Sequence, residues 1–138
     1  NPTDAHYPAS ITKIMTGLLP VENGGLQDTL VFSEDSIRKT EGSGIARDIG
    51  EEMTVEQTLY GMMLESANEC AWALGEYVSG DMESFVNLMN KRTARELGAY
   101  DSNFVNPHGL HDENHYTCAY DMALISKEAF SNDEFPNI

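Results

Sequence analysis

Apolar residues recur at helical spacing along most of this chain, and that periodicity constrains the fold more than any other feature of the sequence. The first such stretch contains Ile11, Ile14, Met15, Leu18 and Leu19, which share one helix face. The same spacing predicts further helices over residues 54–63, 69–77, 81–97 and 117–130. Only residues 29–33 and 43–47 resemble short strands. The chain is therefore predicted to be mainly α, with at most a small β-hairpin between these two segments.

Particular residues mark where the helices begin and end. Pro8 and Ser10 indicate the start of the first helix. Pro20 is expected to kink or end it, because its nitrogen cannot donate to the carbonyl of Thr16. A turn is expected over residues 23–25, and a polar break over 65–68 separates two helices. Three helix caps are predicted: Thr54 with Gln57 in a capping box, Asp81, and Thr117.

Size and charge exclude several classes of protein. The chain has 138 residues, enough for one domain, and carries 8 Lys and Arg against 23 Asp and Glu, a net charge of −15. This balance argues against binding to nucleic acids and to anionic membrane surfaces, since both need basic charge. The sequence contains no transmembrane stretch and no signal peptide. It begins at Asn1 rather than Met, which indicates a processed or truncated product.

Two short motifs place chemically useful side chains at helix boundaries. In Ser10-Ile-Thr-Lys13, a lysine follows a serine by three residues, so both lie on one helix face. A neutral lysine there would accept the serine proton, and the positive end of the helix dipole would favour that neutral form. Ser66-Ala-Asn68 lies in the polar break. Taken singly, the first motif also fits a capping serine with a solvated lysine, and the second fits a turn.

Taken in order, these motifs and their surroundings resemble the serine-type D-alanyl-D-alanine carboxypeptidases, the low-molecular-mass penicillin-binding proteins of the DD-peptidase/β-lactamase superfamily. The resemblance extends from about residue 6 to the C-terminus. The segments that carry it are YPASITKIMT (7–16), ESANE (65–69), FVNLMN (85–90), FVNPHGL (104–110) and HYTCAYD (115–121).

The resemblance implies a role for each matching residue. Ser10 would be the nucleophile that forms an acyl-enzyme, with its backbone N–H as one oxyanion donor, and Lys13 the general base. Ser66 would relay a proton to the leaving D-alanine, and Asn68 would hold Lys13 and the substrate amide carbonyl. The implied substrate is a peptidoglycan pentapeptide ending in D-Ala-D-Ala, with β-lactams as acylating inhibitors and no cofactor. The implied location is extracytoplasmic, in the cell envelope, with any membrane anchor outside this chain.

The sequence also departs from the family pattern. None of its lysines, at positions 13, 39, 91 and 127, begins the Lys-Thr-Gly or Lys-Ser-Gly motif of the family's central sheet. The nearest match, Lys39-Thr-Glu-Gly42, precedes the second motif instead of following it. Residues 1–138 are thus expected to form the helical part of an incomplete catalytic domain that lacks this sheet. Such a part should be inactive alone and should self-associate through its sheet-facing surface.

Two other functions stay open at this point. A β-lactamase-like hydrolase would need a water-activating carboxylate, and no ExxLN-like segment follows Ser66. A non-catalytic helical binding module would explain the missing third motif.

The sequence contains two groups of potential metal or redox ligands. A cluster of His108, His111 and His115 with two carboxylates could bind zinc, but its spacing fits neither HExxH nor a zinc finger, so no metal is expected. Cys70 and Cys118 form no CxxC pair, and we expect two unpaired, buried thiols.

Overall fold

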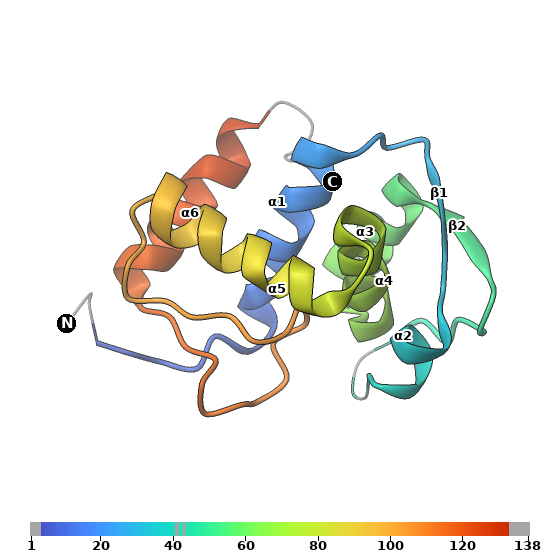
Figure 1. Cartoon of the computed structure of the whole chain (residues 1–138), viewed down its shortest axis with the longest axis horizontal. Coiled ribbons are helices and arrows are strands. Elements are labelled where there is room, and N and C mark those ends of the chain that lie inside the picture. The colour runs from blue at the N-terminus through green and yellow to red at the C-terminus, as the bar shows by residue number, and fades with distance from the viewer. Residues whose placement is uncertain (1–3, 41, 43, 133–138) are drawn as a thin grey trace.

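The computed structural model describes residues 4–40, 42 and 44–132, and at Ser10 only the backbone. It confirms a mainly α fold with one two-stranded antiparallel sheet (Figure 1). The elements in chain order are the 3₁₀-helix η1 (Ala9–Thr12), α1 (Lys13–Asn23), β1 (Thr29–Val31), α2 (Glu34–Arg38), β2 (Glu52–Thr54), α3 (Val55–Glu65), α4 (Asn68–Ser79), α5 (Met82–Lys91), the π-helix η2 (Arg92–Glu96) and α6 (Ala119–Ser131).

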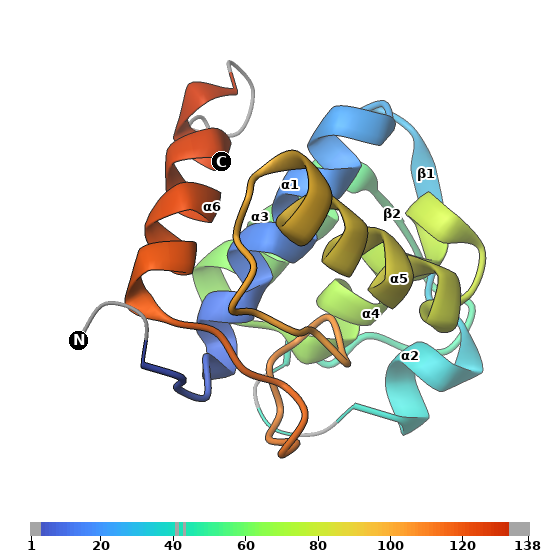
Figure 2. The ribbon, with the colours of Figure 1, turned by 60° about the vertical axis from the view of Figure 1, so that its left-hand side comes forward.

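Helix α1 forms the centre of the molecule. It lies between α6 on one side and the α3–α4 pair on the other, with α5 packed nearby (Figures 1 and 2). Eight of its 11 residues are buried, as expected for a helix that is covered by other helices around most of its circumference. The core around it includes Leu18, Leu59, Leu74, Phe85 and Ile125, all fully buried. The N-terminal end of α1 is therefore fixed by packing on several sides, and this end carries Lys13.

Pro20 was expected to kink or end the first helix, and it does not end it. Helix α1 continues to Asn23, and Pro20 is buried within it. The proline removes one backbone hydrogen bond, but the buried residues around it retain their packing in the core. The last turn is closed by other donors, since Gly24 N–H donates to the Pro20 carbonyl at 2.9 Å and Asn23 Nδ2 to the Leu19 carbonyl at 2.9 Å. The chain leaves the helix at the predicted turn over residues 23–25.

The hairpin forms with a partner other than the predicted one. β1 lies within residues 29–33 as expected, but it pairs with Glu52–Thr54 and not with residues 43–47. Within that predicted partner, the Ile45 N–H donates to the Glu69 carboxylate, and Ala46 has a left-handed backbone with φ 55°. This segment is therefore held against the start of α4, where Glu69 lies, and does not pair with β1. The short helix α2 was not predicted from the sequence. It begins at Glu34 and is capped by Ser33, whose hydroxyl accepts from the Ser36 N–H.

Most of the helix caps agree with the sequence. Thr54 and Gln57 form a complete capping box before α3, and Asp81 caps α5. The exception is α6, which is capped by Cys118 and not by Thr117. Thr117 exchanges two backbone hydrogen bonds with His6, at 2.7 and 2.9 Å. This antiparallel bridge holds Thr117 in an extended segment, so the helix begins two residues later.

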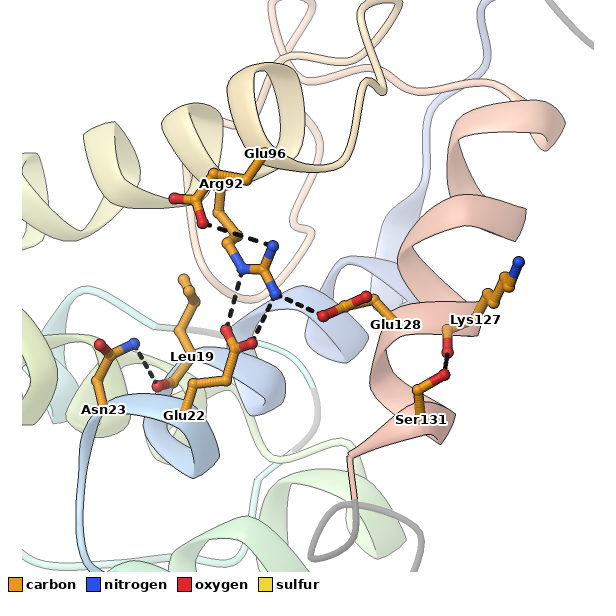
Figure 3. Close-up of polar contacts among 8 residues, drawn as sticks. All are labelled: Leu19, Glu22, Asn23, Arg92, Glu96, Lys127, Glu128 and Ser131. Carbon is orange, nitrogen blue, oxygen red and sulfur yellow. Dashed lines mark hydrogen bonds and ion pairs between the residues drawn. The ribbon is translucent and has the colours of Figure 1, made fainter.

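One ion-pair cluster joins the ends of three helical elements (Figure 3). The Arg92 guanidinium contacts Glu22 of α1 at 2.6 Å, Glu128 of α6 at 2.8 Å and Glu96 of η2 at 3.5 Å. These contacts link α1, η2 and α6 on the side remote from Lys13. Both cysteines are unpaired and buried, as predicted. Among the described residues, none of the helices has the length and apolar character needed to cross a bilayer.

Candidate active site

A pocket of about 290 Å³ is lined by Asn68 of the second motif and by Ala9, the residue that precedes the first motif. Four separate parts of the chain form its walls: the segment around the start of η1, the loop that contains Gly42, the first turn of α4, and the turn that follows Pro107. The lining residues are Tyr7, Ala9, Gly42, Asn68, His108, Gly109, Leu110 and His111. We refer to this opening as the active-site pocket. It brings together residues that lie far apart in the sequence.

The predicted nucleophile lies beside this pocket. The Ser10 backbone belongs to η1, next to the pocket residue Ala9, while the Ser10 side chain is outside the described part of the structure. Ala9 has a left-handed backbone with φ 49°, a conformation that costs a non-glycine residue roughly 1–2 kcal/mol. Strained residues of this kind concentrate at functional sites, where surrounding contacts maintain them.

Lys13, the predicted base, is the first residue of α1 and is only 3 % exposed. Its Nζ donates a hydrogen bond to the backbone carbonyl of His108 at 3.0 Å. Burial lowers the pKa of Lys13 from its usual 10.5, because a desolvated ammonium is disfavoured. A neutral amine keeps two N–H groups and gains a lone pair. One N–H can thus stay on His108 while the lone pair accepts a proton.

The turn that holds Lys13 is itself rigidly closed. Asn106 bridges it, since its Oδ1 accepts from Gly109 N–H at 2.7 Å and its Nδ2 donates to the Leu110 carbonyl at 2.9 Å. Gly109 has φ 89°, in the left-handed region that glycine occupies without strain. A second contact from α1 reaches the same turn, from the Thr16 hydroxyl to the Pro107 carbonyl at 2.5 Å.

Two buried histidines pack beneath the pocket without carrying charge at neutral pH. Burial, with the charge of Lys13 adding to it, lowers the pKa of His108 to about 4, and its ring stacks on Trp72. Burial also lowers the pKa of His115 to about 4, against an opposing effect of Asp112. A positive charge on His108 would repel the ammonium of Lys13, so a neutral His108 ring adds no such repulsion to the site.

His115 connects the first motif to the adjacent loop. Its Nδ1 accepts from the Val105 N–H at 2.9 Å, and its Nε2 lies 2.7 Å from the Thr12 hydroxyl. Because Nδ1 acts as acceptor, the hydrogen-bond network assigns the proton of the neutral ring to Nε2, which donates to Thr12. Thr12 lies between Ser10 and Lys13 in the chain. His115 therefore fixes the backbone between the predicted nucleophile and its base.

The second motif occupies the sharp turn between α3 and α4. Ser66 caps α3 in a left-handed conformation with φ 52°, and Asn68 is the first residue of α4, buried and facing the pocket. Gly42 comes so close to Asn68 that a Cβ there would lie 3.1 Å from Nδ2. Of the predicted site residues, Asn68 thus lines the pocket directly, and Lys13 joins it through the His108 carbonyl. Ser66 is half-buried and is not among the lining residues.

Several residues of the site were not assigned to it from the sequence. Thr12 and Thr16 fix the Lys13 region through hydrogen bonds to distant residues, and Asn106 closes the turn that holds Lys13 through hydrogen bonds to Gly109 and Leu110. The carbonyl groups of Pro107 and His108 accept hydrogen bonds from side chains of α1, and no side-chain pattern in this segment indicates that use. The three histidines of the possible zinc cluster have different environments. His108 and His115 are buried, and a ring nitrogen of each accepts a backbone hydrogen bond, while His111 packs against Tyr7 at the surface.

Comparisons with known proteins identify the relatives of this chain. Residues 1–136 match the family described as D-alanyl-D-alanine carboxypeptidase. The chain is similar to D-alanyl-D-alanine carboxypeptidase DacF of Bacillus subtilis, at 43% identity over 93% of this chain and 34% of the relative. It is also similar to DacA of Haemophilus influenzae, at 33% identity over 91% of this chain and 33% of the relative. The chain therefore spans about a third of the length of these relatives.

Solved structures show the same fold. The D-alanyl-D-alanine carboxypeptidase DacD of Francisella tularensis matches with a TM-score of 0.89 and 33% identity, over 99% of this chain and 33% of that one. Penicillin binding protein 5 of Haemophilus influenzae matches with a TM-score of 0.88 and 31% identity, over 96% and 40% of the two chains.

Proposed function

Because this chain belongs to the D-alanyl-D-alanine carboxypeptidase family, we propose that it provides the nucleophile and proton-transfer groups of a serine carboxypeptidase. The substrate would be a peptidoglycan peptide ending in D-Ala-D-Ala, from which the terminal D-alanine is released. The site would act in the bacterial cell envelope, outside the cytoplasm, and β-lactams would acylate the same serine.

The proposed reaction has two steps. The Ser10 hydroxyl attacks the carbonyl carbon of the penultimate D-alanine while Lys13 takes the hydroxyl proton. The carbon–nitrogen bond to the terminal D-alanine breaks as Ser66 gives its proton to the leaving nitrogen and takes in its place the proton held by Lys13. Asn68 orients Lys13 and the amide carbonyl. Water then hydrolyses the ester, which releases the shortened peptide and restores Ser10. Neither step requires a cofactor or a metal.

The observation that best supports this proposal is the environment of Lys13. An exposed lysine is almost fully charged at neutral pH and cannot act as a base. Here burial lowers the Lys13 pKa, and the His108 carbonyl holds Nζ at 3.0 Å in a fixed position at the start of α1. A pKa closer to the working pH increases the fraction of neutral amine that can accept the Ser10 proton.

We further propose that residues 1–138 act as the helical part of the catalytic domain. They contain no Lys-Thr-Gly or Lys-Ser-Gly motif, so the expected second oxyanion donor and the lysine for the substrate carboxylate are missing from them. Loss of one oxyanion donor alone costs about 10²–10³ in rate. The 138-residue chain should therefore not turn over diacetyl-Lys-D-Ala-D-Ala, whereas the full-length product of its gene should.

Covalent labelling tests the assignment. The full-length protein is treated with a labelled penicillin, digested, and mapped by mass spectrometry. The label should lie on the peptide that contains Ser10. Ser10→Ala should abolish labelling and lower peptide turnover by about 10⁴ or more, while Ser126→Ala on α6 should label normally.

The same experiment separates the alternatives. Label on another residue would refute the Ser10 assignment. A penicilloyl adduct that is hydrolysed within seconds would indicate a β-lactamase, and the absence of any adduct would indicate a non-catalytic binding module.

A further inference from the structure

Three side chains that can bind a metal meet where α6 begins. Asp101, Cys118 and Asp121 each offer one ligand atom, and these three atoms all lie within 4.8 Å of one another. Cys118 is the N-cap of α6 and Asp121 lies in its first turn, whereas Asp101 comes from the loop that follows η2. None of the three lines the active-site pocket. We refer to them as the α6 cluster.

The Asp121 carboxylate in this cluster is only half satisfied. Its Oδ2 accepts two hydrogen bonds, from the Asp101 N–H at 2.8 Å and from the Ser102 hydroxyl at 2.7 Å. Its Oδ1 is buried and has no hydrogen-bond partner among the described residues, in a side chain that is 1% exposed. A buried carboxylate oxygen with neither a donor nor a cation is costly, and such oxygens are rare in folded proteins. The unused oxygen therefore indicates a missing partner.

The charge of the surroundings shows that this partner is a cation. The sequence has no Lys or Arg over residues 96–126, the stretch that contains the whole α6 cluster. In the part of the chain that the structure describes, no ion pair involves Asp101 or Asp121. The N-terminal end of α6 supplies only a partial positive charge. Two carboxylates thus lie close together without a full counter-charge.

The sulfur of Cys118 restricts which cation fits. Cys118 is 1% exposed, and its Sγ accepts the Asp121 N–H at 3.4 Å, so the sulfur is held in place beside the carboxylate. Calcium and magnesium take oxygen ligands only. Zinc takes thiolate sulfur and carboxylate oxygen together, usually with four ligands in a tetrahedral arrangement. One sulfur and two carboxylates leave the fourth position for water on the exposed side, where Asp101 lies.

We propose that the α6 cluster is a zinc site, with Asp101, Cys118 and Asp121 as its protein ligands. With Zn–S about 2.3 Å and Zn–O about 2.0–2.2 Å, tetrahedral ligand atoms lie roughly 3.5 Å apart. The cluster must therefore contract by about 1 Å, and the exposed Asp101 side chain has room to make this movement. On binding, the Cys118 thiol loses its proton to solvent and the thiolate binds Zn²⁺.

The role of this site is structural. The metal ties the loop after η2 to the start of α6, next to the two backbone bridges that join Asn103 to Tyr116 and His6 to Thr117. His6 begins the segment that leads to Ser10. Zinc should therefore stabilise the folded protein, because it binds the native arrangement of the three ligands and not the unfolded chain.

The test uses Co²⁺ as a coloured substitute for Zn²⁺ on the full-length protein, after reduction and removal of metals. A thiolate bound to Co²⁺ gives an intense charge-transfer absorption in the near ultraviolet. We expect this band in the wild type and its loss when Zn²⁺ is added. Cys118→Ser should lack the band while keeping α6 capped, because serine is a good N-cap. Cys70→Ala is the matched control, since it removes the other buried thiol and should keep the band.

A second variant tests the carboxylates at a surface position, where folding is not at risk. Competition with a chromogenic chelator measures the Zn²⁺ affinity. Asp101→Asn should weaken it by at least about tenfold, and Cys118→Ser by more than the 10–100-fold that loss of an outer-shell partner costs. Asp112→Asn, which removes an exposed carboxylate outside the cluster, should leave it unchanged. Zn²⁺ should also raise the unfolding temperature of the wild type but not that of Cys118→Ser.

The remaining outcomes overturn the site. A wild type without the thiolate band has no metal on Cys118, and a band that persists in Cys118→Ser or disappears in Cys70→Ala places the metal on another thiol. An Asp112→Asn variant that loses as much affinity as Asp101→Asn shows that Zn²⁺ is attracted by the net negative charge and not by three ligands.

Discussion

Replacement of His115 should remove a measurable part of the acid sensitivity of this fold. The imidazole is 1% exposed and is held between the Val105 N–H and the Thr12 hydroxyl. Burial lowers its pKa to about 4 from the usual 6.5. The folded protein therefore keeps this ring neutral at pH values where the unfolded chain protonates it.

The sign and size of the effect follow from this difference. Between pH 6.5 and 4 the unfolded state binds a proton that the native state does not, so stability falls as the pH falls. The stability that the neutral His115 ring contributes is fully present above pH 6.5, and the loss of that stability levels off below pH 4. Between pH 7.5 and 5.0 the pKa values of His115 correspond to a loss of about 2 kcal/mol in the free energy of unfolding. His108, whose pKa is also lowered to about 4, should add a similar amount.

Urea unfolding at pH 7.5 and 5.0 measures this quantity, and both values lie above the isoelectric point of about 4.3. His115→Gln should reduce the pH-dependent loss by about 2 kcal/mol relative to the wild type. Any constant cost of the substitution cancels, because each protein is compared with itself. His6→Gln, at an exposed histidine, is the control for loss of an imidazole. An unchanged pH dependence in His115→Gln would refute the argument that burial keeps this ring neutral.

Three further predictions concern other residues. Lys13→Arg keeps the charge but removes the titratable base, so acylation by penicillin should slow by at least about 10²–10⁴, and a near-normal rate would contradict the role of Lys13 as the base. Burial raises the pKa of Cys70 to about 12, so both thiols, Cys70 and Cys118, should react slowly with thiol reagents in the folded chain and be titrated fully after unfolding without reductant. A disulfide would instead give no thiols and a mass two daltons lower. Arg92→Met leaves Glu22, Glu96 and Glu128 without their shared cation. It should lower the free energy of unfolding by about 1–3 kcal/mol in urea titrations, and 1 M salt should reduce this difference. An unchanged free energy of unfolding would show that the ion pairs of Arg92 do not stabilise the fold.

Local signals in the sequence predicted the elements that depend on nearby residues. The capping box at Thr54, the Asp81 cap and the turn after Asn23 all involve groups within four residues of one another, and such contacts can be identified from spacing alone. The errors occurred where distant residues competed for the same backbone. Residues 43–47 were expected in the hairpin, but the Glu69 carboxylate accepts the Ile45 N–H. Thr117 was expected as a cap, but its backbone pairs with His6.

The same distinction applies to the site. The sequence by itself determined the Ser10–Lys13 motif, the Ser-x-Asn turn and their order, because each is a short run of residues on or beside one helix. Only the tertiary structure decided how Lys13 is held. Its acceptor is a backbone carbonyl 95 residues away, and every residue has a carbonyl, so no side-chain pattern identifies this one. The lowered pKa of Lys13 likewise results from burial, a property that the packing of several helices creates and that one segment does not have alone.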